Sequence, residues 1–231
     1  MIELKNICFK YEEKFVLNNI SLRIQEGSYT AIIGANGSGK TTLGKHLNGL
    51  LVPSKGNVIV DGLNTKQNEL DIRKKVGFVF QNFEDQLIYS IVEEDVAFGL
   101  ENLEMKYVEI KKTVDNILRE LNIDQIAKSN VNMISIGQKQ LVALAGVLAM
   151  KPKYIVFDEP TTMLDAKNKK NIMQIINRLS KSNITIILVT NVLDDIRYAE
   201  EVILLKEGRV IFKGKKQKLT KKLLLDANLN D

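Results

Sequence analysis

The stretch Gly34-Ala-Asn-Gly-Ser-Gly-Lys-Thr41 decides the fold, because it fits the pattern G-x-x-x-x-G-K-[ST] at every fixed position. It follows a short β-rich run, residues 29–33, and opens a helix-like segment, residues 41–50. In a strand–loop–helix unit, glycines let backbone N–H groups curl around phosphate oxygens, and the helix N-terminus adds a positive dipole end. The pattern therefore predicts binding of a nucleoside triphosphate.

Two side chains of this loop have predicted roles of their own. Lys40 is expected to reach the β- and γ-phosphates, and the Thr41 hydroxyl is expected to hold Mg²⁺. The other loop residues predicted to line the nucleotide are Gly34, Asn36, Gly37, Ser38, Gly39 and Thr42.

A second site segment lies in Tyr154-Ile-Val-Phe-Asp158-Glu159-Pro160. Four apolar residues before Asp158 are typical of a strand buried in a parallel sheet. A carboxylate at the end of such a strand faces the phosphate loop, so Asp158 is predicted to hold Mg²⁺ directly or through water. Glu159 is predicted to polarise the attacking water as general base. Elsewhere an Asp-Glu pair would usually be surface charge, and the buried strand favours the functional interpretation.

The remaining sequence predicts a single α/β domain with a partly parallel sheet. Residues 2–11 and 16–24 alternate apolar and polar residues, which indicates an antiparallel pair. Glycine is sparse and apolar residues recur at helical spacing in residues 84–150, which indicates an inserted helical lobe. Within 1–231 we expect a core and β-subdomain at 1–83 and 151–217, the helical lobe at 84–150, and a solvated basic tail at 218–231. Further strands are expected at 58–60, 76–80, 154–157 and 184–190, a hairpin at 201–212 turned at Glu207-Gly208, and helices at 167–181 and 193–199.

Composition narrows the class of protein. The 231 residues are 45% hydrophobic and 26% charged, which is ordinary for a globular protein and excludes disordered, collagenous and disulfide-rich classes. The single cysteine, Cys8, cannot form an internal disulfide, which fits a reducing cytoplasm. The net charge of +5 suits an anionic ligand or membrane surface but is too diffuse to predict nucleic-acid binding. We expect neither a signal peptide nor a transmembrane segment, since the apolar run 141–150 is too short to span a bilayer.

The combined motifs resemble the ATP-binding-cassette ATPases of transporters over residues 2 to about 217. Gln81, after Val79-Phe80, looks like the family's glutamine loop, which touches Mg²⁺ and water. Met163-Leu164-Asp165 is similar to the loop that crosses the dimer interface. Tyr11 occupies the place of the aromatic that stacks on adenine, although a sheet-surface tyrosine is the alternative. The signature loop is matched by Ser135-Ile136-Gly137-Gln138, so the resemblance implies that Ser135, Gly137, Gln138 and Asp165 contact ATP.

Several stretches are similar to the ATPase subunits of energy-coupling factor transporters, the CbiO-like group. They are Lys45–Leu51, Val79–Asn82, Gln86 and Val92–Asn102. The last of these, together with Met163-Leu164-Asp165, favours the first of two paralogous A subunits. This resemblance implies a second ATPase subunit, a transmembrane T subunit and a vitamin- or metal-binding S subunit. It also implies a peripheral location on the cytoplasmic face of the cell membrane and no nucleic-acid partner.

Three positions depart from the family pattern. Ile136 stands where the signature has glycine, and we expect strain of about 1–3 kcal/mol if the loop keeps a glycine conformation. Asn191 stands in place of the switch histidine; it can hydrogen-bond a γ-phosphate but cannot carry a positive charge. Leu141 replaces an arginine. The only histidine, His46, lies in the phosphate-loop helix and is expected to pack or face solvent.

Because the family's dimer is head to tail, the two main departures would fall on different ATP sites of a heterodimer. Asn191 would slow hydrolysis at the site built on Lys40, by about 10²–10⁴ for a lost acid–base or orienting group. Ile136 would weaken the site on the partner's phosphate loop. Since the chain stops at Asp231, before the C-terminal segment typical of the family, we expect weak dimerisation without nucleotide. Two alternatives stay open: a soluble cassette protein and a non-catalytic nucleotide-sensing subunit.

Overall fold

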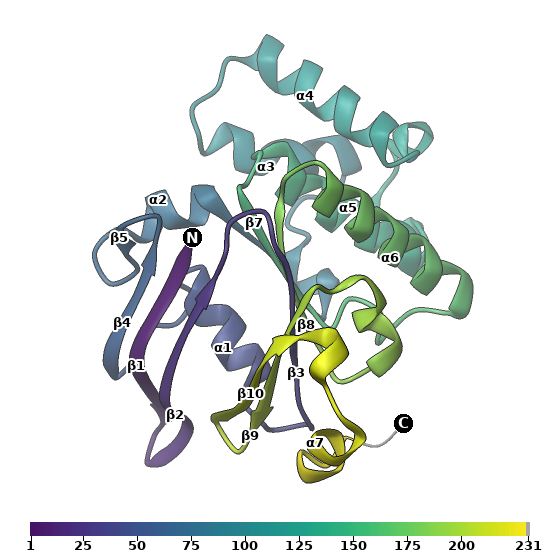
Figure 1. The fold of residues 1–231 in the computed structure, drawn as a ribbon. Coiled ribbons are helices and arrows are strands. Elements are labelled where there is room, and N and C mark those ends of the chain that lie inside the picture. Colours follow the sequence, from purple (N-terminus) through teal and green to yellow (C-terminus); the bar gives the residue numbers. More distant parts are fainter. Residues whose placement is uncertain (230–231) are drawn as a thin grey trace.

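Two β-sheets and several helices form the protein, whose computed structural model describes residues 1–229 (Figure 1). A four-stranded sheet has the order β2-β1-β4-β5, and a six-stranded sheet has the order β10-β9-β3-β8-β7-β6. The strands of the first sheet are β1 (Ile2–Tyr11), β2 (Lys14–Ile24), β4 (Lys55–Val60) and β5 (Leu63–Asn64). Those of the second are β3 (Tyr29–Ile33), β6 (Val76–Val79), β7 (Tyr154–Asp158), β8 (Thr185–Thr190), β9 (Glu201–Lys206) and β10 (Arg209–Lys215).

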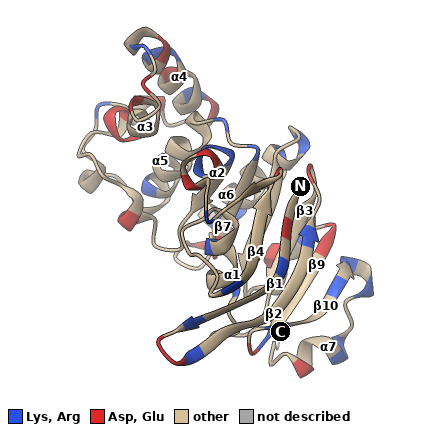
Figure 2. Ribbon diagram, turned by 90° about the vertical axis from the view of Figure 1, so that its left-hand side faces the viewer, with Lys and Arg blue, Asp and Glu red and all other residues tan. Residues whose placement is uncertain are grey.

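The helices cover the sheets and extend beyond them. They are α1 (Lys40–Leu47), α2 (Glu69–Lys75), α3 (Val92–Glu101), α4 (Tyr107–Glu120), α5 (Ile136–Ala149), α6 (Ala166–Lys181) and α7 (Lys221–Asp226). Short 3₁₀ turns include η1 (Phe83–Gln86) and η4 (Leu193–Tyr198). In Figures 1 and 2, α3 and α4 lie at one end of the molecule and α7 at the other.

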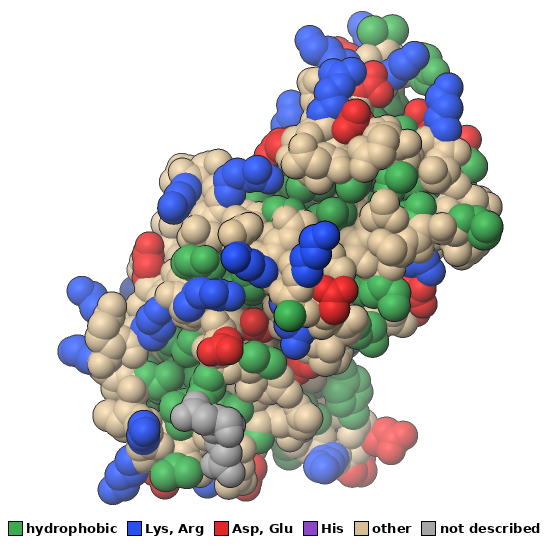
Figure 3. All heavy atoms as spheres, turned by 90° about the vertical axis from the view of Figure 1, so that its right-hand side faces the viewer, with side chains coloured by type: hydrophobic (Ala, Val, Ile, Leu, Met, Phe, Trp, Pro, Cys, Tyr) green, Lys and Arg blue, Asp and Glu red, His purple; other side chains and the backbone are tan. Residues whose placement is uncertain are grey.

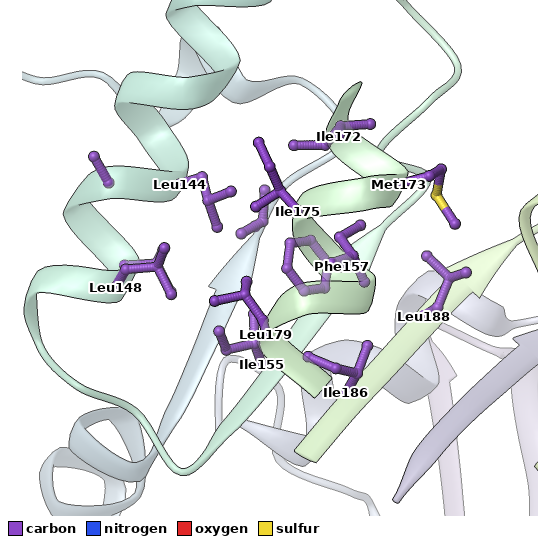
Figure 4. Packing of buried hydrophobic residues seen from close by; sticks show 14 of the residues in the cluster. Leu144, Leu148, Ile155, Phe157, Ile172, Met173, Ile175, Leu179, Ile186 and Leu188 are labelled. Carbon is purple, nitrogen blue, oxygen red and sulfur yellow. The ribbon is translucent and has the colours of Figure 1, made fainter. Parts of the chain in front are cut away.

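The six-stranded sheet is parallel except for β10, which runs antiparallel to β9. Every residue of β3, β7 and β8 is buried, as expected for strands covered on both faces. On one face, Leu144 and Leu148 of α5 and Ile175 of α6 converge on Phe157 of β7 (Figure 4). On the other face, α1 packs between the two sheets in a second apolar cluster. These layers bring the carboxyl ends of β3, β6, β7 and β8 to one edge.

The predicted fold class and nearly all predicted elements agree with the structure, and the differences have local causes. The helix after the phosphate loop ends at Leu47 rather than residue 50, because Gly49 takes a left-handed conformation with φ +74°. Helix α2 was not predicted, since only Ile72 in it is buried and no apolar period exists. The short helix predicted at 193–199 is a 3₁₀ turn, Leu193–Tyr198.

The tail is not simply solvated, which corrects the expectation for residues 218–231. Helix α7 begins at Lys221 with the Thr220 side chain as its cap, and Ala227 and Leu229 are buried in the main apolar cluster. The apolar residues of this segment therefore anchor it, while its lysines stay exposed next to the basic residues of β10 (Figure 2). The last two residues, 230 and 231, lie outside the described part of the chain.

The surface has no broad apolar belt on the side seen in Figure 3, where hydrophobic side chains reach the surface in small groups among charged ones. Within residues 1–229, no helix combines the length and apolar character needed to cross a membrane.

Candidate functional site

The phosphate loop joins β3 to α1 at the carboxyl edge of the six-stranded sheet. Its last glycine, Gly39, is the N-cap of α1 and offers no side-chain oxygen to the first turn of the helix. The first N–H groups of a helix lack intrahelical partners, so an uncapped start of this kind suits an anion. The geometry matches the loop predicted from the motif.

Lys40 and Ser38 carry hydrogen-bond donors in this loop that are only partly used or not used at all. Lys40 is 5% exposed, and its ammonium donates to the Ala35 carbonyl at 3.1 Å and lies 3.9 Å from a Glu159 carboxylate oxygen. Burial lowers the pKa of Lys40, and the Glu159 and Asp158 carboxylates act in the opposite direction. The buried Ser38 hydroxyl has no hydrogen-bond partner in the described chain. A phosphate group would supply the acceptors that these donors lack, so the loop fits such a ligand.

Asp158 at the end of β7 meets the start of α1. Its Oδ1 accepts a hydrogen bond from the Thr41 hydroxyl at 2.8 Å, and its side chain is almost fully buried. Burial raises the pKa of Asp158, with the Thr41 hydrogen bond opposing that shift. A buried carboxylate beside a hydroxyl is a fitting donor set for Mg²⁺, which usually takes one or two carboxylates and completes its shell with phosphates and water. No group of three or more His, Cys, Asp or Glu side chains suited to a metal occurs in residues 1–229.

Glu159 has a strained backbone that several partners hold in place. Its φ is +46°, a left-handed value that non-glycine residues rarely adopt, and its N–H donates to the Val189 carbonyl at 2.8 Å. Its Oε2 accepts from the Gln81 amide at 3.0 Å and from the Thr162 hydroxyl at 3.3 Å. Gln81, which follows β6, and Glu159, which follows β7, are therefore brought together by the pairing of these strands.

A pocket of about 540 Å³ opens in front of the phosphate loop. Glu159 lines one side, and the β1–β2 hairpin and the β9–β10 turn line the rest. Tyr11 lies on the rim with 49% of its surface exposed, and its ring packs edge-on against Phe9 at 4.9 Å. Phe15, 58% exposed, lies on the same rim. An exposed aromatic at a hairpin end was the only signal that could have pointed to Phe15.

The β9–β10 turn at Glu207-Gly208 was predicted from the sequence, but its contact with the phosphate loop was not. The Gly208 N–H donates to the Ser38 carbonyl at 3.0 Å, and the Gly208 carbonyl accepts from Asn18 at 2.8 Å. Gly208 has φ +73°, and a Cβ there would lie 2.3 Å from the Val16 carbonyl oxygen, so only glycine fits. The turn thereby ties the phosphate loop to β2.

Asn191 reaches the phosphate loop from the end of β8. Its Nδ2 donates to Asn36 Oδ1 at 2.9 Å. His46 packs, in line with one of its two predicted settings: it is fully buried, its Nδ1 donates to the Thr42 carbonyl at 2.6 Å, and its ring lies 4.7 Å from that of Phe9. Burial lowers the pKa of His46, so it supplies no charge in place of the missing switch histidine.

The signature residues lie apart from this pocket, at the start of α5. Ser135 and Gln138 form a capping box: Ser135 Oγ accepts from the Gln138 N–H, and Gln138 Oε1 accepts from the Ser135 N–H. Asp165 caps α6 by accepting from the Asn168 N–H at 2.9 Å. A Cβ on Gly137 would lie 2.7 Å from Asn168 Oδ1, so a larger residue there would displace the Asn168 side chain. In the described chain, Ser135, Gly137, Gln138 and Asp165 take no part in lining the pocket.

The condition for backbone strain at Ile136, a glycine conformation of the loop, is not met in the structure. Ile136 is the first residue of α5, its φ is not positive, and its side chain is 56% exposed. The position needs neither a left-handed conformation nor close packing, because Ser135 already ends the loop as N-cap. Leu141, the third departure, is partly buried against the main apolar cluster.

Comparisons with known proteins agree with this geometry. A family model described as ABC transporter matches residues 17–162. A relative from Clostridium novyi, the energy-coupling factor transporter ATP-binding protein EcfA1, is 41% identical over an alignment of 237 positions, which covers 99% of this chain and 85% of that protein.

Two solved structures share the fold. The cbiO1 protein of Clostridium perfringens, part of the ABC transporter complex cbiONQ, has a TM-score of 0.86 and 35% identity, covering 97% of this chain and 92% of that one. The cassette MJ0796, solved as a dimer in a post-hydrolysis state with ADP and Pi, has a TM-score of 0.83 and 33% identity, covering 93% and 98%. The chain therefore belongs to the ATP-binding-cassette ATPases of transporters, and within them it is similar to the energy-coupling factor and CbiO proteins.

Proposed function

We propose that this chain binds and hydrolyses ATP to energise an importer of the energy-coupling factor type, which carries a vitamin or a metal ion. The observation that carries the proposal is the convergence of Lys40, Thr41, Asp158, Glu159 and Gln81 at one edge of the sheet. Ligands of open α/β sheets bind outside the carboxyl ends of the strands, where these five side chains meet.

In this proposal the phosphate loop, Gly34 to Thr42, binds the phosphates, and Tyr11 with Phe15 stacks on the base. Thr41, Asp158 and Gln81 would hold Mg²⁺, which neutralises charge on the transferred phosphoryl group. Lys40 leaves its contact with the Ala35 carbonyl and pairs with the β- and γ-phosphates. The donor set around the loop supports these roles, since its ammonium and hydroxyl groups are short of acceptors.

Glu159 acts as general base in the proposed reaction. Its carboxylate is oriented by the Gln81 amide and the Thr162 hydroxyl, and it lies next to Lys40 at the mouth of the pocket. It takes the proton of the attacking water while Lys40 stabilises charge on the γ-phosphate. Asn191 donates a neutral hydrogen bond where the family has histidine, so the site lacks one positive charge in the transition state.

We further propose that the working unit is a head-to-tail heterodimer with a second ATPase subunit. Ser135, Gly137, Gln138 and Asp165 do not line the pocket of their own chain, which leaves them available to the nucleotide of a partner. The site built on this chain's own phosphate loop would bind ATP firmly and hydrolyse it slowly because of Asn191. Ile136 imposes no backbone strain, so any weakening of the partner's site comes from its exposed side chain alone.

The proposed membrane partners are a transmembrane T subunit and a substrate-binding S subunit, with this chain peripheral on the cytoplasmic face. The support is the similarity to EcfA1 and to cbiO1, a part of the cbiONQ complex. We also propose that residues 1–231 act as one unit, with the segments 1–83 and 151–217 as the nucleotide-binding core, 84–150 as the helical lobe that meets the membrane partner, and 218–231 as a tail.

Two experiments test these proposals. The tagged chain is purified from mild-detergent extracts of host membranes, and a second cassette ATPase with a polytopic membrane protein should copurify. Recovery of the chain only as a soluble monomer or homodimer would contradict the transporter assembly.

The second experiment measures transport and ATPase activity of that complex with Glu159→Gln. A lower rate supports hydrolysis at this site. Unchanged transport would favour the alternative that Asn191 suggests, a subunit that binds nucleotide without needing its own hydrolysis.

A further inference from the structure

Gln140 of helix α5 is a buried polar residue for which the site described above gives no role. Eight residues of α5 are buried, and Gln140 is the polar one among seven apolar neighbours. It precedes Leu144 and Leu148 by four and eight positions, so it shares the helix face that packs on β7 and α6 in Figure 4. A polar side chain at such a position is unfavourable unless its hydrogen bonds are made.

The hydrogen bond of Gln140 goes to the residue that follows the general base. Its side-chain amide donates to the Pro160 carbonyl at 2.6 Å, and the contact is buried. The Pro160 carbonyl lies one peptide beyond Glu159, four bonds from the Glu159 Cα, and Glu159 has a φ of +46°. The N–H on the other side of Glu159 is held by the Val189 carbonyl. Val189 therefore holds the backbone at Glu159 itself, and Gln140 holds it at the next residue, Pro160.

The same helix also carries the signature residues. The capping box of Ser135 and Gln138 forms the first turn of α5, and Gln140 follows within the second turn. The neighbouring Lys139 pairs with Glu84 at 2.5 Å, in the η1 turn that follows Gln81. A shift of α5 would thus move both partners of the Gln81–Glu159 hydrogen bond.

We propose that Gln140 is a positioning residue for ATP hydrolysis, which holds the backbone of Glu159 through Pro160 and links it to the helix that bears the signature. The inference rests on the proposed role of Glu159 as general base. Loss of the Gln140 amide would therefore displace Glu159 without disturbing the phosphate loop.

The test uses the complex that copurifies with the tagged full-length chain and the variant Gln140→Met. Methionine has a similar length, suits the apolar face and donates no hydrogen bond. The matched control is Gln174→Met, because Gln174 is an exposed residue of α6. ATP affinity, melting temperature, KM and kcat are measured for each complex. The decrease in kcat that Glu159→Gln causes is taken as the contribution of this ATP site.

We expect Gln140→Met to lower that part of kcat by about 10- to 100-fold, as for a misplaced catalytic group, with ATP affinity and KM changed by less than about twofold. Gln174→Met should change none of these values. A fall in melting temperature with an unchanged kcat for Gln140→Met would mean that Gln140 is merely structural, and would overturn the inference.

A double variant separates this inference from the proposed function. In a Glu159→Gln background, Gln140→Met should lower single-turnover hydrolysis of radiolabelled ATP by less than about twofold, because its target is already absent. Losses that multiply would show that Gln140 acts elsewhere. If Glu159→Gln alone left the rate unchanged, the proposed function and this inference would both be wrong. If Glu159→Gln lowered the rate and Gln140→Met did not, this inference alone would be wrong.

Discussion

The replacement Ile136→Gly tests whether the altered signature loop is strained, and the sign of its effect on stability is decisive. Ile136 is the first residue of α5, with φ outside the left-handed region and a side chain 56% exposed. The substitution therefore relieves no strain and creates no cavity. What remains is helix propensity, in which glycine is less favourable than isoleucine by about 0.5 kcal/mol.

For a domain of this size about 1 kcal/mol corresponds to a shift in melting temperature of roughly 2–4 °C, so Ile136→Gly should lower the melting temperature by about 1–2 °C. If the loop kept a glycine conformation, relief of strain of about 1–3 kcal/mol would instead raise the melting temperature by roughly 2–12 °C. Differential scanning calorimetry of the full chain without nucleotide distinguishes these signs.

The control for this prediction is Ile136→Ala, which shortens the side chain but does not favour a left-handed backbone. Alanine is the better helix former, so this variant should melt at or slightly above the wild-type temperature. Stabilisation by glycine together with destabilisation by alanine would refute the argument. In the assembled complex, equal rates for both variants would mean that any effect of Ile136 on the partner's site comes from side-chain bulk.

Three further predictions concern the cap, a buried acid and the pocket rim. Ser135→Ala removes the capping box with Gln138 and should cost about 1 kcal/mol in a urea or thermal unfolding series. Burial raises the pKa of Asp195, a buried residue of the η4 turn, so its ionised form opposes folding above that pKa, and this penalty fades as the pH falls through it. Asp195→Asn, which keeps an acceptor, should therefore raise the melting temperature near neutral pH, with a difference from wild type that shrinks in acid; a pH-independent difference would contradict this. Tyr11→Ala and Phe15→Ala should each weaken ATP binding by about 2- to 13-fold, corresponding to about 0.5–1.5 kcal/mol of stacking, and titration calorimetry that finds no change for either would remove the proposed base platform.

The strands and the phosphate loop could be predicted because their determinants are local. Residues 29–33 and 154–157 are nearly continuous apolar runs, and the structure has them as buried parallel strands. Helix α2 could not be predicted, since one buried residue, Ile72, gives no period to detect. The burial of Ala227 and Leu229 was equally hidden, because it depends on where the end of the sheet places the tail.

By itself, the sequence determined which chemistry this chain can offer. Eight contiguous residues, 34 to 41, encode a loop whose donors need phosphate acceptors, and Asp158 with Glu159 is marked by the apolar strand before it. The resemblance added Gln81 and Asn191 as candidates but gave them no positions in space.

Only the tertiary structure decided how these groups meet. The strand order β3-β8-β7-β6 brings Gln81 to Glu159 over 78 residues of sequence and holds Pro160 against Gln140. The structure also shows that Ile136 begins helix α5, where a glycine conformation is not needed. The physical reason is that hydrogen bonds between distant segments depend on strand pairing and helix packing, which are cooperative properties of the whole core and leave no mark on a local pattern of residues.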